Sequence, residues 1–165
     1  MPAYEVEHIC DLTEDEQDKI AETITNIHSE TFATPKLFVN VRFTNIAHHV
    51  TYVAGKRRRT NRIFAHVRHG PSRTQSDYDG VSEAILGVWN TIVGPSKVDA
   101  ELRLIMYFGS IVAGTEVGFH LPAAGGDANW ITENLHAFQT RATEGDDDFS
   151  DMLEELKARG LVRSN

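Results

Sequence analysis

Pro2 has the most distinctive chemistry in this sequence, because removal of Met1 would leave proline's secondary amine at the start of the chain. An ordinary α-amino group has a pKa of roughly 7.7 to 8.0, and apolar burial or a nearby cation lowers that pKa. A general base is most effective when its pKa lies near the working pH. Pro2 is therefore a candidate acid/base group, although proteins that make no chemical use of it also begin with Met-Pro.

The periodicity of the first 45 residues predicts one β-α-β unit. Residues 4–10 read as a strand, and Thr13 with Glu16 forms a capping box that opens a helix. His28 lies one turn beyond the apolar stripe of that helix, so we expect it on or beside the buried face. A second strand is predicted by the next segment, in which one set of apolar residues alternates with Phe38, Asn40 and Arg42; that set is Leu37, Val39, Val41 and Phe43.

A second unit of the same order follows. A hairpin strand at 50–54 precedes a strand at 62–69, a helix from about 74 to 94 and a strand at 102–109. Each unit joins two parallel strands through a helix, so both helices are predicted to cross over onto one sheet with the same hand. The sequence therefore predicts an α+β fold, in which a fused pair of β-α-β units forms a four-stranded mixed sheet with two helices on one face. The other face would need cover, which oligomerisation would supply.

The rest of the chain predicts a helical extension. A helical segment near 127–142 is followed by an amphipathic helix at about 147–159, with acids at its start and basic residues at its end. We expect a single domain over residues 1–165, with a core at about 2–142 and an acidic C-terminal helical extension at 143–165.

Composition excludes several classes of protein. The chain has 165 residues, of which 41% are hydrophobic, and its net charge is −8. That charge argues against nucleic acid as a partner. No apolar run approaches a membrane span, and the first thirty residues do not resemble a signal peptide. These features predict a soluble, cytoplasmic protein with no membrane partner, in which the single Cys10 is a buried structural thiol.

Charge is unevenly distributed along the chain. Residues 56–59 and Arg62 form a basic run, whereas residues 144–155 are strongly acidic. Both segments have a simple interpretation as solvated surface patches. Alternatively, the basic run neutralises small anionic ligands or meets the acidic tail of a neighbouring subunit.

A set of separated motifs resembles the tautomerase superfamily, and within it the cis-chloroacrylic acid dehalogenase group. These motifs are Pro2-Ala3-Tyr4, His28, Arg73, Tyr107-Phe108-Gly109, Glu116-Val117-Gly118 and Leu121-Pro122. Their order and spacing fit over roughly residues 2–140. The resemblance implies a tautomerase-like fold assembled as a homotrimer, and an enzyme that needs no cofactor.

The resemblance also implies roles for individual residues. Pro2 would be the acid/base, and Arg73 would clamp the carboxylate of a small substrate with its planar guanidinium. His28 would hydrogen-bond the substrate, while Tyr107 and Glu116 would position or activate water. Structural roles are the alternative for each residue.

The alternatives are specific. Arg73 would pair only with Asp77 or Asp79 at the start of its helix, His28 would be a satisfied core histidine, and Tyr107 would be a core residue.

The sequence departs from the family pattern in three places. Gly70 stands where the family places a first substrate-binding arginine, three residues before Arg73. Arg68 would point to the same side of an extended strand, about 6.6 Å away at 3.3 Å per residue, and is a candidate substitute. The loop before Glu116 is shorter than the family pattern, and the basic run at 56–59 lies outside the likeness.

Histidine pairs give little support to a metal site. His48 and His49 are adjacent, and His66 and His69 are three residues apart, so neither pair shares one face of a strand. Two functional hypotheses remain. One is an isomerase, lyase (hydratase) or dehalogenase-like hydrolase acting on a small 2-oxo or unsaturated carboxylate. The other is a non-catalytic trimeric binding protein that keeps the fold.

Overall fold

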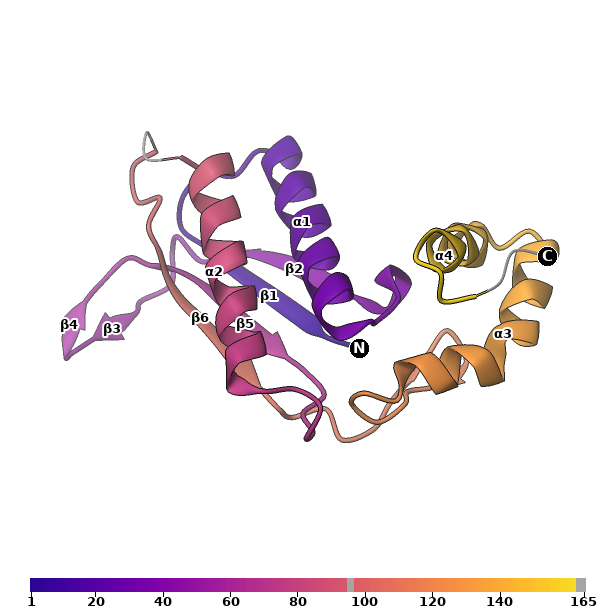
Figure 1. Ribbon diagram of the computed structural model, residues 1–165. Coiled ribbons are helices and arrows are strands. Elements are labelled where there is room, and N and C mark those ends of the chain that lie inside the picture. The colour runs from indigo at the N-terminus through magenta and orange to yellow at the C-terminus, as the bar shows by residue number, and fades with distance from the viewer. Residues whose placement is uncertain (95–96, 163–165) are drawn as a thin grey trace.

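The computed structural model describes residues 1–94 and 97–162 and has a four-stranded mixed sheet at its centre (Figure 1). β1 (Ala3–His8) lies parallel to β2 (Asn40–Asn45) and antiparallel to β5 (Asn61–His66), which in turn lies parallel to β6 (Leu102–Phe108). The strand order is β2-β1-β5-β6. The prediction of two fused β-α-β units in an α+β fold is confirmed.

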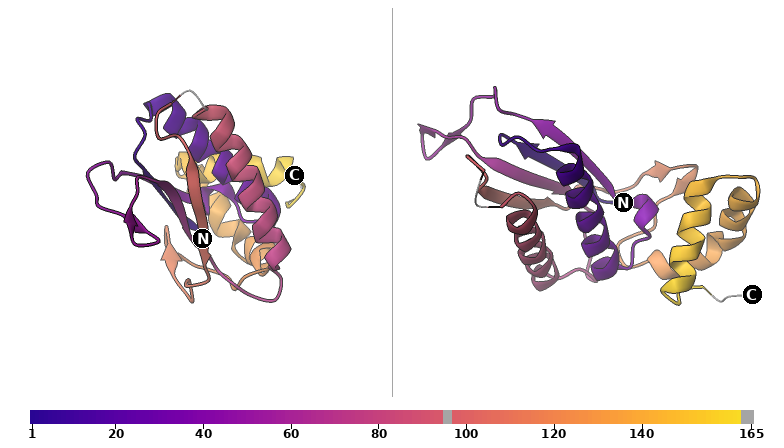
Figure 2. Two further views of the ribbon diagram at one scale, coloured as in Figure 1. Left: turned by 90° about the vertical axis from the view of Figure 1, so that its left-hand side faces the viewer. Right: turned by 90° about the horizontal axis from the view of Figure 1, so that it is seen from above.

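Two long helices cover one face of this sheet (Figures 1 and 2). α1 (Glu14–Phe32) and α2 (Gln75–Ile92) each begin with a capping box, built on Thr13 and Thr74 respectively. Such boxes satisfy backbone N–H groups that the first helical turn leaves free. The principal core lies between the helices and the sheet; its fully buried side chains include Val6, Ile20, Ile24, Ile63 and Trp89.

The second predicted strand begins later than the sequence pattern indicated. Residues Lys36–Phe38 form a short 3-10 helix, η1, and β2 starts only at Asn40. Phe38 is 2% exposed and packs edge-on against Trp130, with ring centroids 5.1 Å apart. Burial of this ring against the C-terminal half therefore takes Leu37 and Phe38 out of the strand predicted for residues 37–43.

The predicted hairpin strand at 50–54 is shorter than expected and has its own partner. β3 (Tyr52–Val53) pairs with β4 (Lys56–Arg57) in a two-stranded hairpin that projects from the sheet (Figure 1). Ala54 and Gly55 at its tip both have positive φ angles, as a tight hairpin turn requires.

The C-terminal half forms a second hydrophobic cluster beside the N-terminus. A small hairpin of β7 (Thr115–Glu116) and β8 (Phe119–His120) leads into α3 (Asp127–Thr143), which packs against α4 (Asp147–Ala158). The cluster is centred on Phe138, Phe149, Met152 and Leu156, and the partly buried Met1 and Leu37 pack against it. Both predicted C-terminal helices are present, and residues 163–165 of the predicted extension lie outside the described part of the chain.

The sheet face opposite α1 and α2 is uncovered within one chain. It carries the ion pair Glu5–Arg42 between β1 and β2, and the ion pair Glu7–Arg62 between the central strands β1 and β5. Toward the β6 edge it carries an apolar strip made of the exposed Met106 and Phe108 and the half-buried Phe64. No helix among the described residues has the length and apolarity needed to cross a membrane.

Candidate functional site

The start of the chain is held in the middle of the sheet. Pro2 is buried, and its carbonyl accepts a hydrogen bond from the Asn40 N–H at 3.1 Å. Ala3 lies opposite His66 because β5 runs antiparallel to β1. The segment that follows His66 therefore leaves the sheet beside the N-terminus, which is how Arg68 comes close to it.

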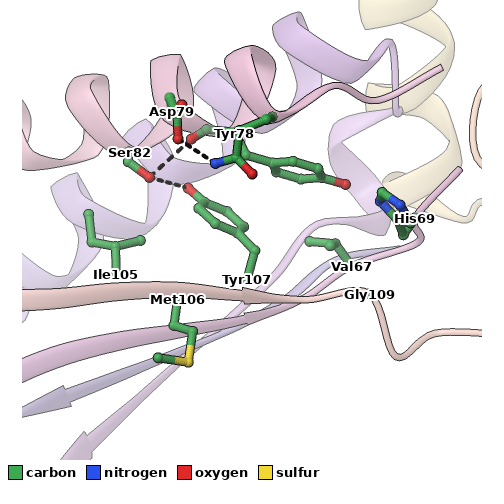
Figure 3. A pocket seen from close by; sticks show the side chains of 10 residues that line it. Val67, His69, Tyr78, Asp79, Ser82, Ile105, Met106, Tyr107 and Gly109 are labelled. Atoms are coloured by element: carbon green, nitrogen blue, oxygen red, sulfur yellow. Dashed lines mark hydrogen bonds between the residues drawn. The ribbon is translucent and has the colours of Figure 1, made fainter. Parts of the chain in front are cut away.

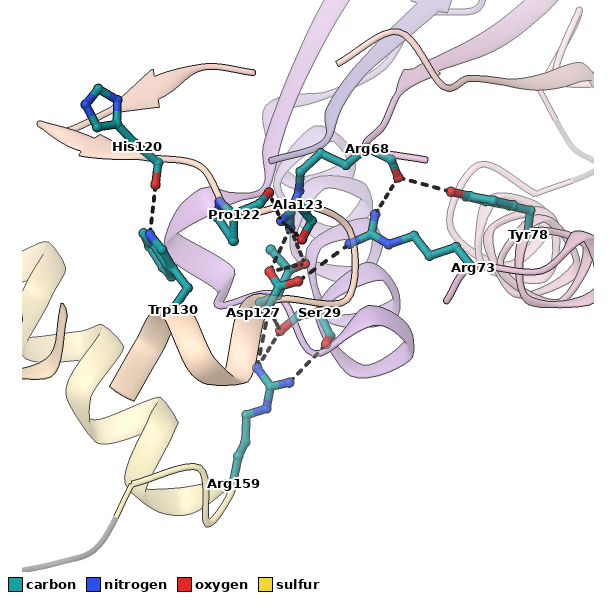
Figure 4. A network of polar contacts seen from close by, with 11 residues as sticks. Ser29, Arg68, Arg73, Tyr78, His120, Pro122, Ala123, Asp127, Trp130 and Arg159 are labelled. Carbon is teal, nitrogen blue, oxygen red and sulfur yellow. Dashed lines mark hydrogen bonds and ion pairs between the residues drawn. The ribbon is translucent and has the colours of Figure 1, made fainter. Parts of the chain in front are cut away.

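Arg68 is buried in contacts with the protein (Figure 4). Its Nη1 donates to the carbonyls of Pro122 and Ala123 at 2.8 and 3.3 Å, and its Nη2 donates to Asp127 Oδ1 at 2.7 Å and to Thr34 Oγ1 at 3.3 Å. Each Nη carries two hydrogens, so these four contacts use all of them. Only the buried Nε lacks a partner among the described residues. In this arrangement Arg68 offers no free pair of N–H groups to a substrate carboxylate.

Arg73 lies on the other side of Asp127. Its guanidinium sits over the ring of Phe32, 4.5 Å from the ring centroid, and its Nη1 donates to the Arg68 carbonyl at 3.1 Å. Nη2 lies 3.9 Å from Asp127 Oδ2, and neither atom has a hydrogen-bond partner among the described residues. Burial, followed by repulsion from Arg68, lowers the pKa of Arg73.

The ion pairs predicted for a structural Arg73 are not the ones that form. Asp77 accepts hydrogen bonds from Thr74 in the capping box, and Asp79 accepts from Gln75 Nε2 at 2.7 Å. Arg73 pairs with Asp127 instead. Arg73 Nη2 and Arg68 Nε are thus buried guanidinium nitrogens of the site without a hydrogen-bond partner among the described residues.

His28 is fully buried on α1. Its Nδ1 is hydrogen-bonded to the Tyr4 hydroxyl at 2.9 Å, and its Nε2 has no partner among the described residues. Burial, reinforced by the nearby Arg73 and the N-terminus, lowers the pKa of the imidazole to about 2. His28 is thus a neutral ring at physiological pH, with one nitrogen held and the other free to meet a ligand.

Glu116 reaches the same region despite its shortened loop. It lies on β7, where Oε1 accepts a hydrogen bond from Asn40 Nδ2 at 3.0 Å and Oε2 is buried without a partner among the described residues. Its negative charge raises the pKa of the N-terminal amine, in opposition to the larger effect of burial. Asn40 therefore links this carboxylate to the strand that flanks Pro2.

Met1 lies beside Arg68 and Asp127. The adjoining cavity, lined by Met1, Arg68, Asp127 and Trp130 among others, measures about 10 Å³. Burial, followed by the charge of Arg68, lowers the pKa of the Met1 amine from 8.0 to about 5, while Asp127 opposes the shift. The Met1 amine is therefore neutral at pH 7.

Tyr107 faces a different pocket (Figure 3). This pocket has a volume of about 470 Å³ and lies between α2 and β6, lined also by His69, Tyr78, Asp79 and Ser82. The Tyr107 hydroxyl accepts a hydrogen bond from Ser82 at 3.4 Å, and burial raises its pKa to about 12. The structure thus brings together His28, Arg68, Arg73 and Glu116 beside the N-terminus, and places Tyr107 apart from them.

Asp127 is the residue of this site that the sequence pattern did not reveal. It is the first residue of α3, where an acid is expected simply because it stabilises a helix N-terminus. Its contacts with Arg68 span 59 positions of sequence, so no local pattern indicates them. The described residues include no group of three or more His, Cys, Asp or Glu side chains that could hold a metal ion.

Comparison with known families decides the membership of the chain. Residues 1–135 match the Tautomerase_3 family, described as "Putative oxalocrotonate tautomerase enzyme". The chain belongs to this family. The resemblance to the tautomerase superfamily seen in the sequence is thereby confirmed. No curated protein matches the chain.

Solved structures share the fold. N1, a member of the cis-3-chloroacrylic acid dehalogenase family, is 20% identical with a TM-score of 0.64, covering 90% of this chain and 99% of its own. MIF2 of Leishmania major is 15% identical with a TM-score of 0.57, covering 73% and 97%. A fused 4-OT, Q0, solved as a symmetric trimer, is 16% identical with a TM-score of 0.57, covering 74% and 98%.

His28 makes the stability of the protein dependent on pH. In the unfolded chain the imidazole takes up a proton below its ordinary pKa of 6.5, whereas in the folded chain it stays neutral down to about pH 2. Stability is therefore lost as the pH falls through 6.5. Between pH 7 and pH 5 the wild type should lose about 2 kcal/mol more unfolding free energy than His28→Gln. Urea unfolding measures this, with the exposed His49→Gln as control, and parallel pH dependences of wild type and His28→Gln would contradict it.

Asp127 should contribute strongly to stability, because its removal strands two buried guanidinium groups. Asp127→Asn is expected to cost about 3 to 5 kcal/mol of unfolding free energy. The matched control is Asp146→Asn, which breaks the more exposed Arg141–Asp146 pair and should cost less than about 1 kcal/mol. The double variant Arg68→Met/Asp127→Leu, which leaves only Arg73 without its counter-ion, should be less damaging than Asp127→Asn. Equal losses for Asp127→Asn and Asp146→Asn in urea unfolding would refute this account.

Proposed function

We propose that this chain is a cofactor-free enzyme of the tautomerase superfamily, in which the amine of Pro2 is the acid/base once Met1 has been removed. The observation that carries the proposal is the position of the N-terminus. It lies at the buried start of β1 among His28, Arg73, Glu116 and Asp127, where burial lowers the pKa of the Met1 amine to about 5. A neutral amine at that position takes a proton from a substrate and returns it at another atom.

The unpaired polar atoms of the site suggest how a substrate binds. Arg73 Nη2 and His28 Nε2 are buried and lack hydrogen-bond partners among the described residues. A substrate carboxylate would accept a hydrogen bond from Arg73, and a neighbouring substrate oxygen would accept one from His28. Glu116 Oε2, also unpaired, would orient water in a hydration or a hydrolytic dehalogenation. Arg68 acts in this proposal by holding Asp127 and the 122–123 backbone rather than by binding substrate.

The role predicted for Tyr107, which is to position or activate water, stays a prediction. Within the described residues its hydroxyl contacts Ser82, and its ring packs on Tyr78 with centroids 5.0 Å apart. Tyr78 in turn donates a hydrogen bond to the Arg68 carbonyl at 3.3 Å. Tyr107 is thus connected to the site through Tyr78.

The charges of the site favour a substrate with a single carboxylate. Arg68 and Arg73 are balanced by Glu116 and Asp127, so the site is neutral around a neutral amine. One incoming carboxylate pairs with Arg73, whereas a second would be desolvated near two acidic side chains without a counter-ion. We therefore propose a small 2-oxo or unsaturated monocarboxylate, processed by tautomerisation, hydration or hydrolytic dehalogenation.

A non-catalytic binding protein is the second candidate. The observation that favours it is that Arg68 is fully engaged with the protein and that the cavity beside Met1 is only about 10 Å³. A chain that keeps Met1 has an amide at Pro2 and no basic nitrogen there. The two candidates differ in whether Met1 removal, which vacates this volume, also produces turnover.

The activity experiment begins with the intact mass of the purified protein. A chain starting at Pro2 should convert phenylenolpyruvate or cis-3-chloroacrylate, followed by NMR, and should act less efficiently on the dicarboxylate 2-hydroxymuconate. Pro2→Ala should lower kcat/KM by about 100-fold or more, because general acid/base catalysis contributes factors of that size. Pro71→Ala, at an exposed loop proline, is the matched control and should retain full activity.

Two outcomes would contradict the enzyme. One is a Pro2→Ala variant that turns substrate over at the wild-type rate. The other is a chain with a free Pro2 amine that binds these carboxylates saturably but converts none of them, which would support the binding protein.

We also propose that the chain assembles as a homotrimer through its uncovered sheet face. Phe108 is 38% exposed and Met106 is 40% exposed in one chain, and an apolar strip of this kind is typical of a subunit interface. The fused 4-OT Q0, which shares the fold, is a symmetric trimer.

Light scattering should give three times the 18.4 kDa mass of one chain. Phe108→Glu should shift the protein to the monomer, because it buries an unpaired charge in the interface. Val98→Glu introduces the same charge at a residue that is 85% exposed and should leave the trimer intact. A monomeric wild type at micromolar concentration would overturn the assignment.

A further inference from the structure

A basic pocket lies at the opposite end of β1 from Met1, at the base of the β3-β4 hairpin. Its volume is about 220 Å³, and Ile9, the residue after β1, lines it. The polar side chains around it come from His48, His49, Arg57, Arg58, Arg59 and Thr60. None of the described residues that line this pocket is acidic.

The walls of the pocket are tied together by hydrogen bonds. The Arg58 N–H donates to the Thr51 carbonyl at 2.9 Å, which joins the two sides of the hairpin. Arg59 Nε donates to Asp99 Oδ2 at 2.9 Å, and its Nη1 donates to the Ala47 carbonyl at 3.4 Å. These hydrogen bonds hold together the backbone segments that carry the basic side chains.

Thr60 supplies an independent sign of a ligand. The residue is only 5% exposed, and its Oγ1 is buried without a hydrogen-bond partner among the described residues. A buried hydroxyl left without a partner costs free energy, so such a group calls for an explanation. An acceptor oxygen of a ligand in the pocket would satisfy it.

The charge of the pocket points to a dianion. Arg57, Arg58 and Arg59 carry three positive charges, of which Asp99 neutralises one. A phosphate monoester carries a charge of about −1.5 to −2 at neutral pH and has three strong acceptor oxygens. Guanidinium groups bind such oxygens in pairs, and a hydroxyl and imidazole N–H groups can supply further donors.

We propose that this pocket binds the phosphate group of a small phosphorylated molecule. The six residues of β1 separate it from the N-terminus by on the order of 20 Å at 3.3 Å per residue. The site is thus distinct from the one beside Pro2, and it stands whether or not the chain is an enzyme.

The test is a titration of the full ¹⁵N-labelled chain with inorganic phosphate at constant ionic strength, with sodium chloride as the reference salt. Phosphate should cause saturable shifts confined to the amides of Ile9 and of residues 46–60. The variant Arg57→Gln/Arg58→Gln should weaken binding by about tenfold or more, because two charge-assisted contacts are lost. Lys56→Gln removes a charge from the same hairpin at an exposed residue outside the pocket and should bind as the wild type does.

Thr60→Val separates a ligand contact from a structural role. It keeps the shape of the side chain and should weaken phosphate binding several-fold without lowering the melting temperature, since the hydroxyl it removes has no partner in the free protein. Glycerol 3-phosphate in place of inorganic phosphate should bind at least as tightly, because the proposed ligand is an ester.

The proposal is overturned if phosphate causes no saturable shifts, or if Lys56→Gln weakens binding as much as the double variant does. It is also overturned if Arg57→Gln/Arg58→Gln dissociates the oligomer while phosphate binding is unchanged. In that case the basic run contacts a neighbouring subunit.

Discussion

The burial of Asp127 between two arginines is the interaction on which the rest of the site depends. Arg68 and Arg73 are each about 4% exposed, and an ionised side chain that deep is tolerated only with a counter-charge. Asp127 provides it from the start of α3, with one oxygen 2.7 Å from Arg68 and the other 3.9 Å from Arg73. The loop after β5 and the C-terminal half of the chain therefore require each other.

The same region ties the C-terminal helices to α1. Thr34, just beyond α1, receives a hydrogen bond from Arg68 through its hydroxyl, and its carbonyl accepts from Ser29 and Arg159. Glu155 of α4 accepts from the Lys36 N–H at 3.0 Å. The walls of the N-terminal site are thus built by α3, and α4 braces them. The two C-terminal helices are a part of the site rather than an appendage to a complete β-α-β core.

Local sequence patterns were sufficient to predict the sheet and its helices, since the capping box at Thr13, the helical periodicity and the alternating strands depend on near neighbours. They failed where a distant contact decided the outcome. Phe38 follows a strand pattern but turns into η1 to pack on Trp130, 92 residues further along. The partnership of Asp127 with Arg68 was equally invisible, while the placement of His28 on a buried face followed from helical spacing alone.

The antiparallel pairing of the two β-α-β units explains why the two candidate sites lie at the ends of β1. Because β5 runs opposite to β1, the start of β1 meets the loop that leaves β5, and the end of β1 meets the loop that enters it. The first junction receives Arg68 and a buried N-terminus, and the second receives Thr60 and the basic hairpin. A central strand with partners on both sides holds its terminus still, which an acid/base amine requires and which an edge strand would not provide.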